Sequence, residues 1–287
     1  MTTSFRDATL AERMLLRSRH PNIFNQPTGQ RVIAVAVIAV LLALAVYAFI
    51  RLEISFERFG TGLGQMAHMI GMMFPPTPGN RLPLYLHSLG ETVAIAMLGT
   101  LTAAVLAFPI GFLAAKNVVP NIFAHFAVRR FLDTIRGVDT LIWALIFINV
   151  VGLGPFAGIL AIAISDFGSF GKLFSEAVET TSKAPVEGVV STGGSKLHEI
   201  RFALMPQVFP VIASQVLYYF ESNTRSATII GIVGAGGIGM HLSEQIRVLE
   251  WGHVAFLVLM ILVTVAAIDW VSSRLRFAII GRSPVKI

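Results

Sequence analysis

A run of six polar residues, Glu221 to Ser226, interrupts an otherwise apolar stretch of the sequence. Glu221 and Arg225 are four residues apart, so on a helix they share one face and could form an ion pair. Asn223 and Arg225 carry N–H groups that could donate hydrogen bonds to an anion. These charges therefore have two interpretations: they join neighbouring helices, or they line a path for an anion.

The run stands out because the chain carries few other charges. Of its 287 residues, 55% are apolar and only 13% are charged, and the mean hydropathy is +0.74. A soluble domain is about 25% charged, so this chain cannot coat a water-soluble surface. The composition predicts an integral membrane protein and excludes a disordered chain and an ordinary cytosolic enzyme. Because there is no Cys, a disulfide scaffold and thiolate metal ligands are also excluded.

Six stretches are apolar enough and long enough to cross a bilayer as helices. They cover residues 32–50, 92–115, 132–151, 156–173, 207–233 and 254–271. The expected fold is therefore an all-α polytopic membrane protein with about six transmembrane helices.

Arg136 is a further unusual charge, because it lies near the start of the third apolar stretch. Asp133 and Asp139 flank it at three-residue intervals. Ionisable groups at membrane depth are costly, and they usually face a cavity or one another. Arg136 is therefore a candidate for the inner mouth of the path that Arg225 would line.

The excess of positive charge predicts the orientation of the spans. If the N-terminus is cytoplasmic, sixteen Lys and Arg residues fall in cytoplasmic segments and four fall outside. Positive residues concentrate on the cytoplasmic side of membrane proteins, so both termini are expected to be cytoplasmic. The net charge of +6 is thereby explained by topology, and we expect no nucleic-acid partner.

The chain divides into a basic N-terminal segment, residues 1–31, and a membrane domain, residues 32–287. The first span could also be a cleaved signal peptide, since Ala43-Leu44-Ala45 offers a small-residue site. The apolar run continues past that site to Ile50, which favours a retained anchor. Residues 54–73 have an amphipathic pattern that is typical of a helix lying on the outer surface.

The long cytoplasmic connection, residues 176–206, has a pattern of its own. Pro185 suits the first turn of a helix, and the charge of Glu187 suits that end of the helix dipole. Gly193 can adopt a left-handed conformation that ends one short helix and begins another, and Pro206 would start the next span. Two short helices joined at a glycine are typical of a docking element. The alternative is a surface loop that only connects two spans.

This spacing resembles the EAA loop of permease subunits of binding-protein-dependent ABC importers. In that loop a Glu-Ala-Ala triplet is followed at fixed distances by a Gly, an apolar residue and Leu-Pro. The corresponding positions here are Glu187, Gly193, Ala203, Met205 and Pro206. The resemblance implies that these residues belong to coupling helices that sit in a groove of the ATPase subunit.

The sequence departs from the EAA pattern at two places. Gly188-Val189 replaces Ala-Ala, and Met205 replaces Leu, while the distances from Glu187 to Gly193 and from Gly193 to Pro206 are kept. Other segments resemble phosphonate importer permeases in particular: residues 152–158, 171–179 and 219–239, within a likeness that covers residues 85–282.

The family resemblance implies more than the residues themselves show. It implies the type I ABC importer permease fold in a prokaryotic plasma (inner) membrane, a second copy of the chain, surrounding lipids, a cytoplasmic ABC ATPase dimer and an extracytoplasmic substrate-binding protein. The chain would be non-catalytic and bind no cofactor or metal, while the partner ATPase would use ATP and Mg. The cargo would be a phosphonate or a related phosphorus oxyanion, to which Asn223 and Arg225 could donate hydrogen bonds.

Two other functions remain open at this stage. A self-contained secondary transporter or channel could use the same charges, although no internal repeat is visible. An ABC importer could also carry a different solute, such as an amino acid. Residues 234–239 match the dinucleotide fingerprint G-x-G-x-x-G, but they follow a membrane span and no βαβ unit surrounds them. We expect these glycines to serve close helix packing or a broken helix end, with anion binding by exposed amides as the alternative.

Overall fold

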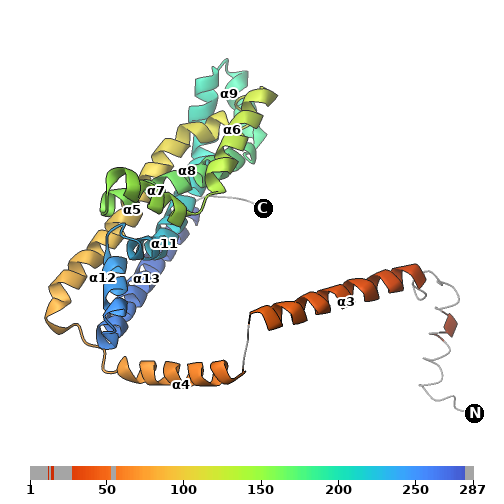
Figure 1. The fold of residues 1–287 in the computed structure, drawn as a ribbon. Helices are drawn as coiled ribbons and strands as arrows, with labels where there is room; N and C mark the ends of the chain where they lie inside the picture. Colours follow the sequence, from red (N-terminus) through yellow and green to blue (C-terminus); the bar gives the residue numbers. More distant parts are fainter. Residues whose placement is uncertain (1–11, 13, 16–27, 53–55, 282–287) are drawn as a thin grey trace, which may run out of the picture. The chain divides into compact units, whose positions relative to one another are not determined.

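The computed structural model describes residue 12 and residues 14–15, 28–52 and 56–281 (Figure 1). The described chain contains helices and turns and no strand. The chain divides into two units, residues 1–68 and 69–287. Most of the predicted basic segment, residues 1–31, lies outside the described residues.

The first unit contains the first predicted span as helix α3 (Thr28–Arg51). Residues 32–51 have a mean hydropathy of 3.0, and the large apolar side chains of this helix are exposed. Helix α4 (Phe56–Met72) follows and is amphipathic, with exposed apolar side chains at Phe59, Leu63 and Met66. Its pattern is that of the surface helix expected from residues 54–73.

Four long helices of the second unit coincide with predicted spans. They are α5 (Leu82–Leu113), α8 (Pro155–Glu179), α11 (Met205–Ile232) and α13 (Trp251–Ile280). All four are longer than their apolar stretches. Helix α5, for example, starts ten residues before the predicted span. Most side chains of this extension are exposed, but Tyr85 is fully buried and its hydroxyl contacts Nδ1 of His253 at 3.1 Å.

The third predicted span, residues 132–151, is wrong as a single helix. The chain forms helix α6 (Ile122–Arg136) and helix α7 (Thr140–Val151), which meet at an angle of 82°. The carboxylate of Asp139 accepts a hydrogen bond of 2.8 Å from the N–H of Leu141, which makes Asp139 the N-cap of a new helix. The twelve residues of α7 extend only about 18 Å, less than the ~30 Å of a bilayer core.

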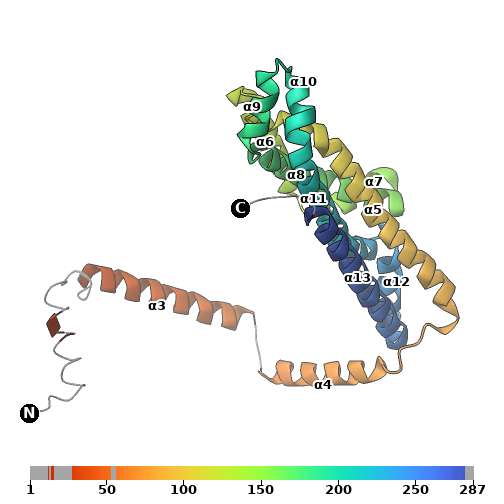
Figure 2. The ribbon, with the colours of Figure 1, turned by 180° about the vertical axis from the view of Figure 1, so that it is seen from behind.

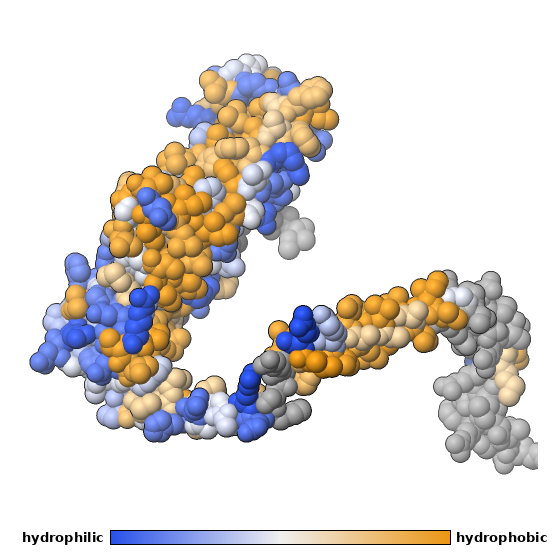
Figure 3. Space-filling model, viewed as in Figure 1, coloured by the Kyte–Doolittle hydropathy of each residue, from blue (hydrophilic) through white to orange (hydrophobic). Residues whose placement is uncertain are grey.

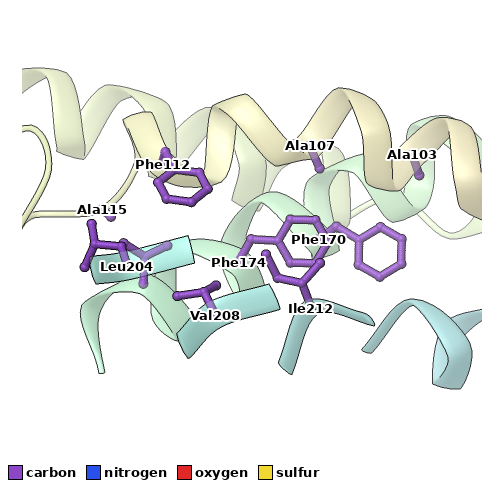
Figure 4. Packing of buried hydrophobic residues seen from close by; sticks show 10 residues of the cluster. Ala103, Ala107, Phe112, Ala115, Phe170, Phe174, Leu204, Val208 and Ile212 are labelled. Atoms are coloured by element: carbon purple, nitrogen blue, oxygen red, sulfur yellow. The ribbon is translucent and has the colours of Figure 1, made fainter. Parts of the chain in front are cut away.

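Helices α5 and α8 approach each other closely because glycines face large side chains at their interface. A Cβ atom on Gly99 would lie 2.7 Å from Cβ of Ile162, and one on Gly111 would lie 2.6 Å from Cβ of Phe174. Small residues permit this separation in membrane bundles. Figure 4 shows the apolar cluster beside Gly111, which joins α5 and α8 to the start of α11. Its members are Ala103, Ala107, Phe112, Ala115, Phe170, Phe174, Val178, Leu204, Val208 and Ile212.

The second unit is an elongated bundle with two different ends. Helix α6 and the short helix α9 (Lys183–Ser191) lie at one end, and α12 (Ile238–Arg247) lies toward the other (Figures 1 and 2). On the face viewed in Figure 3, hydrophobic residues cover the middle of the bundle, whereas hydrophilic residues gather at the end that holds α12. On this face the bundle therefore presents an apolar middle and a more polar end at α12.

Candidate functional site

The connection between α8 and α11 forms a protruding tip, built from α9, a tight turn and α10 (Lys196–His198). Gly193 in the turn has a φ of +78°, the left-handed conformation that its sequence context predicted. The N–H of Gly193 donates to the carbonyl of Val190 (2.9 Å), and the N–H of Gly194 donates to that of Val189 (3.1 Å). These bonds close the end of α9, so the glycine turn fixes the direction in which the chain leaves the helix.

The prediction of two separate short helices is half right. Helix α9 is one of them, but the second is continuous with the next span through α10 and the π-helical segment η2 (Glu199–Leu204). Pro206 lies in the first turn of α11, but η2 leads into this turn without a break. A proline here removes an N–H and would crowd the carbonyl of Phe202 in a regular α-helix. The wider π turn accommodates it, and the side-chain amide of Gln207 donates to the carbonyl of Ala203 at 2.8 Å.

The five residues of the EAA-like pattern fall into two groups. Glu187 and Gly193 are exposed at the tip, and Pro206 is exposed at the start of α11. Ala203 is 1% exposed and Met205 packs against the apolar cluster of Figure 4, so both anchor the tip to the bundle. The pattern therefore combines a surface that a partner could contact with the apolar residues that hold this surface in place.

Apolar side chains also remain uncovered on the tip. Val190 and Leu197 are 52% and 76% exposed, and Phe202 in the adjoining segment η2 is 58% exposed. Large apolar groups in a water-facing segment are typical of a protein contact. The tip thus has the exposed apolar character of a docking element, which a loop that only connects two spans would not need.

Polar contacts that sequence reasoning missed fix the tip to the bundle. The side-chain oxygen of Gln207 accepts a hydrogen bond from the N–H of Ser182 at 3.0 Å, directly before α9. At the end of α8, Glu179 pairs with Arg129 of α6 at 2.9 Å and also accepts from the N–H of Lys116. These contacts join residues 25 to 63 positions apart, so no local pattern indicates them.

The polar run in α11 has two sides. Asn223, 6% exposed, donates hydrogen bonds to the hydroxyl of Thr100 in α5 (2.8 Å) and to the carboxylate of Asp166 in α8. Its amide therefore joins three helices in the interior of the bundle. Arg225 is on the other side of α11, with 51% of its side chain exposed.

Glu221 pairs more closely with a residue that the sequence did not suggest. Arg276 of α13 donates to one oxygen of Glu221 at 3.1 Å, while Nη1 of Arg225 lies 3.7 Å from the other oxygen. The first is a hydrogen-bonded ion pair, and the second is too long for a hydrogen bond. The predicted pair of Glu221 with Arg225 is therefore present as a loose contact within a group of three charges.

Arg136 lies at the end of α6, where the chain bends into α7, and it is exposed. The bend sits against α8: the hydroxyl of Thr140 contacts that of Ser165 at 2.8 Å, and a Cβ on Gly168 would be 2.9 Å from the backbone nitrogen of Arg136. Asp166 lies between these two contact points. The bend and the buried contact of Asp166 with Asn223 therefore occupy the same level of the bundle.

The G-x-G-x-x-G segment forms the turn between α11 and α12. The N–H of Gly154 donates to the carbonyl of Gly234 (3.0 Å), and the N–H of Ile238 donates to the hydroxyl of Thr92 (2.8 Å). Gly239 faces α11, where a Cβ would overlap the carbonyl oxygen of Thr228. The glycines therefore serve a broken helix end and close packing, as the first of the two interpretations held.

Gly239→Ala is expected to destabilise the bundle by about 1–3 kcal/mol, the usual cost of overpacking a tight interface. The added methyl group meets backbone atoms of Thr228 and Gly231, which cannot rotate away. Thermal unfolding in detergent measures the loss. Gly90→Ala in α5 is the matched control, because a Cβ there meets nothing within 4 Å. Equal stability of the two variants would contradict the packing role.

Comparison with known proteins decides the class. Residues 107–280 match the model of the family described as "Binding-protein-dependent transport system inner membrane component". The chain belongs to this family. It is a permease, the membrane component of an inner-membrane transport system, which argues against a self-contained secondary transporter.

Two curated relatives place the permease more closely. It is 39% identical over 241 residues to the permease protein HtxC of Stutzerimonas stutzeri, which is named for a phosphite transport system; the match covers 84% of this chain and 85% of HtxC. It is 35% identical over 255 residues to the phosphate-import permease protein PhnE of Mycolicibacterium smegmatis. That match covers 88% of this chain but 48% of PhnE, so the permease spans about half of that relative.

The fold also has a solved counterpart. A chain of the MetNI methionine ABC transporter, in an inward-facing conformation, matches with a TM-score of 0.63 at 17% identity. The match covers 71% of the permease and 99% of the MetNI chain. The permease thus has the type I ABC importer fold predicted from its sequence.

Proposed function

We propose that this permease forms, as a homodimer, the membrane pathway of an ABC importer for phosphonates or related phosphorus oxyanions. The observation that carries the proposal is the extent of the match to HtxC and PhnE, which are named for phosphite and phosphate transport. Each match covers more than four fifths of this chain. The resemblance of residues 219–239 to phosphonate importer permeases supports the same class of cargo.

The energy for transport comes from a separate ATPase dimer, which uses ATP and Mg. The exposed tip with Glu187 and Gly193 is the contact with one ATPase subunit, and the tip of the second permease copy contacts the other. A single coupling segment per chain supports this arrangement of two copies. On the opposite side of the membrane, a substrate-binding protein delivers the oxyanion.

The tip transmits the movement of the ATPase subunits to the spans. Closure of the ATPase dimer on ATP displaces α9, and the continuous helix from Lys196 to Ile232 carries this displacement into the bundle. The pathway then opens outward and receives the oxyanion. Hydrolysis restores the inward-facing arrangement and releases the cargo into the cytoplasm.

Substrate-stimulated ATP hydrolysis tests which class of solute the importer carries. The permease would be assembled with its ATPase and binding protein in proteoliposomes and offered phosphonates, phosphite, phosphate or methionine. Stimulation by at least one phosphorus oxyanion and not by methionine is expected. A response to none of the phosphorus compounds, or transport without any ATPase, would overturn the proposal.

Arg225→Met is expected to lower the rate of oxyanion transport about tenfold while the dimer still assembles. The half-exposed guanidinium of Arg225 is only loosely held by Glu221, so its donors are available to an oxyanion. Initial uptake rates and size-exclusion profiles measure the two properties. Arg274→Met is the control, since Arg274 is also exposed but lies over the ring of Trp270. Loss of the folded dimer in place of lost transport would show that Arg225 only joins helices.

A further inference from the structure

Glu221 and its two arginines form a charge group that the proposed transport path does not by itself explain. Arg276 comes from α13, and Arg225 and Glu221 come from α11. From this group we propose that Arg276 is a positioning residue: it holds the Glu221 carboxylate, and Arg225 is thereby left available to the transported oxyanion. The inference rests on the proposed function for the class of anion, and it assigns a role to a residue that does not touch that anion.

The distances show which arginine controls the carboxylate. Nη1 of Arg276 hydrogen-bonds Oε2 of Glu221 at 3.1 Å, whereas Nη1 of Arg225 stays 3.7 Å from Oε1. The Arg276 guanidinium also lies 5.8 Å from the centre of the Tyr218 ring. Arg276 is thus fixed from two directions and is 22% exposed, while the side chain of Arg225 is 51% exposed.

The net charge of Glu221, Arg225 and Arg276 indicates why this group would favour an anion. Two guanidinium groups and one carboxylate leave a net charge of +1 on a helix face within the membrane bundle. An uncompensated charge at this depth is costly, and an anion that arrives beside Arg225 reduces the cost. If Glu221 instead made a two-bond ion pair with Arg225, the carboxylate would occupy the donors that the oxyanion needs. Arg276 prevents that pairing because it already binds the carboxylate.

The competing explanation is that the ion pair of Glu221 with Arg276 only joins α11 to α13. This explanation makes a different prediction for a double variant. With Arg276→Gln, Glu221 is free to turn toward Arg225 and compete with the oxyanion. With Glu221→Gln added, the competitor is gone and Arg225 is available again. An ion pair that only joins the two helices would be lost in the single and in the double variant, so both variants should bind phosphite equally weakly.

Calorimetric titration of the purified permease–ATPase complex with phosphite, without the binding protein, measures this competition directly. We expect Arg276→Gln to raise the dissociation constant about tenfold and the double variant Glu221→Gln/Arg276→Gln to return it to within about twofold of the original. Arg276→Lys keeps the charge near Glu221 and should give an intermediate value. Arg274→Gln is the control for loss of a nearby arginine and should leave the constant unchanged.

Three outcomes would overturn the inference: unchanged binding in Arg276→Gln, equally weak binding in the double variant, or no phosphite binding by the original complex. If Arg276→Gln does not fold, the single variant Glu221→Gln still tests the inference. The inference predicts equal or tighter phosphite binding in that variant, and weaker binding would contradict it. The ATP-hydrolysis assay in proteoliposomes is a separate experiment. If the inference about Arg276 fails but phosphorus oxyanions still stimulate ATP hydrolysis in that assay, the proposed function stands.

Discussion

Gly193→Val is expected to uncouple ATP hydrolysis from transport. Gly193 has a φ of +78°, which a β-branched residue adopts only at a cost of about 1–3 kcal/mol. A Cβ at this position meets nothing within 4 Å, so the whole effect comes from the backbone. Valine would move the backbone of residue 193 out of the left-handed region and change the direction of α9 relative to α10. The ratio of oxyanion transported to ATP hydrolysed in proteoliposomes should fall at least fivefold while the permease remains folded.

Two substitutions serve as controls for this prediction. Gly193→Asn should keep coupling near normal, because Asn tolerates the left-handed conformation. Gly188→Ala, in α9 with open space around it, should also be neutral. Gly194→Ala should be harmful for a different reason, since its Cβ would lie 2.8 Å from the carbonyl oxygen of Val189. Normal coupling in Gly193→Val would remove the argument that the glycine turn directs the tip.

Hydropathy was sufficient to locate most of the spans, because a bilayer requires long apolar helices regardless of how they pack. It failed at residues 132–151, where α6 and α7 form a bend. The signal was in the sequence: Gly137 and Asp139 are a helix-ending residue and an N-cap residue in succession. A search for apolar length alone passes over such a break, whereas a search for caps would have divided the stretch.

The glycine turn of the tip was predictable because its determinants are local. The distance from Glu187 to Gly193 and the need for a glycine in a left-handed turn are both properties of neighbouring residues. The continuity of the second helix was not predictable in the same way, because Pro206 normally indicates a helix start. The π-helical segment and the side chain of Gln207 accommodate it, and their geometry depends on packing against the bundle.

The charges within the spans show the limit of sequence reasoning. Glu221 and Arg225 were paired because they are four residues apart, yet the closer partner, Arg276, is 55 positions away. Asn223 was grouped with Arg225 because both side chains carry N–H donors, although the two side chains differ in burial. A helix turns neighbouring residues to different sides, so proximity in sequence did not determine which groups meet.

Asn223→Leu is expected to cost the bundle about 2–3 kcal/mol and to lower the yield of folded permease. The amide of Asn223 donates to the buried carboxylate of Asp166 and to the hydroxyl of Thr100. Leucine would leave both acceptors without this donor, and a buried polar group that loses its hydrogen-bond partner is costly. Thermal unfolding in detergent measures the loss. Asn149→Leu in α7 is the control, because Asn149 is exposed and bonds only a carbonyl of its own helix among the described contacts.

The double variant Asp166→Leu/Asn223→Leu separates the two interpretations of the polar run. Replacing both partners by apolar groups removes the unsatisfied carboxylate, so stability should largely return. If transport returns as well, Asn223 serves to join α5, α8 and α11, and the oxyanion path depends on Arg225 on the other side of the helix. If the stable double variant fails to transport, the buried pair takes part in the path itself. Full stability of Asn223→Leu alone would contradict the helix-joining role, because an amide that bridges three helices cannot be removed without loss.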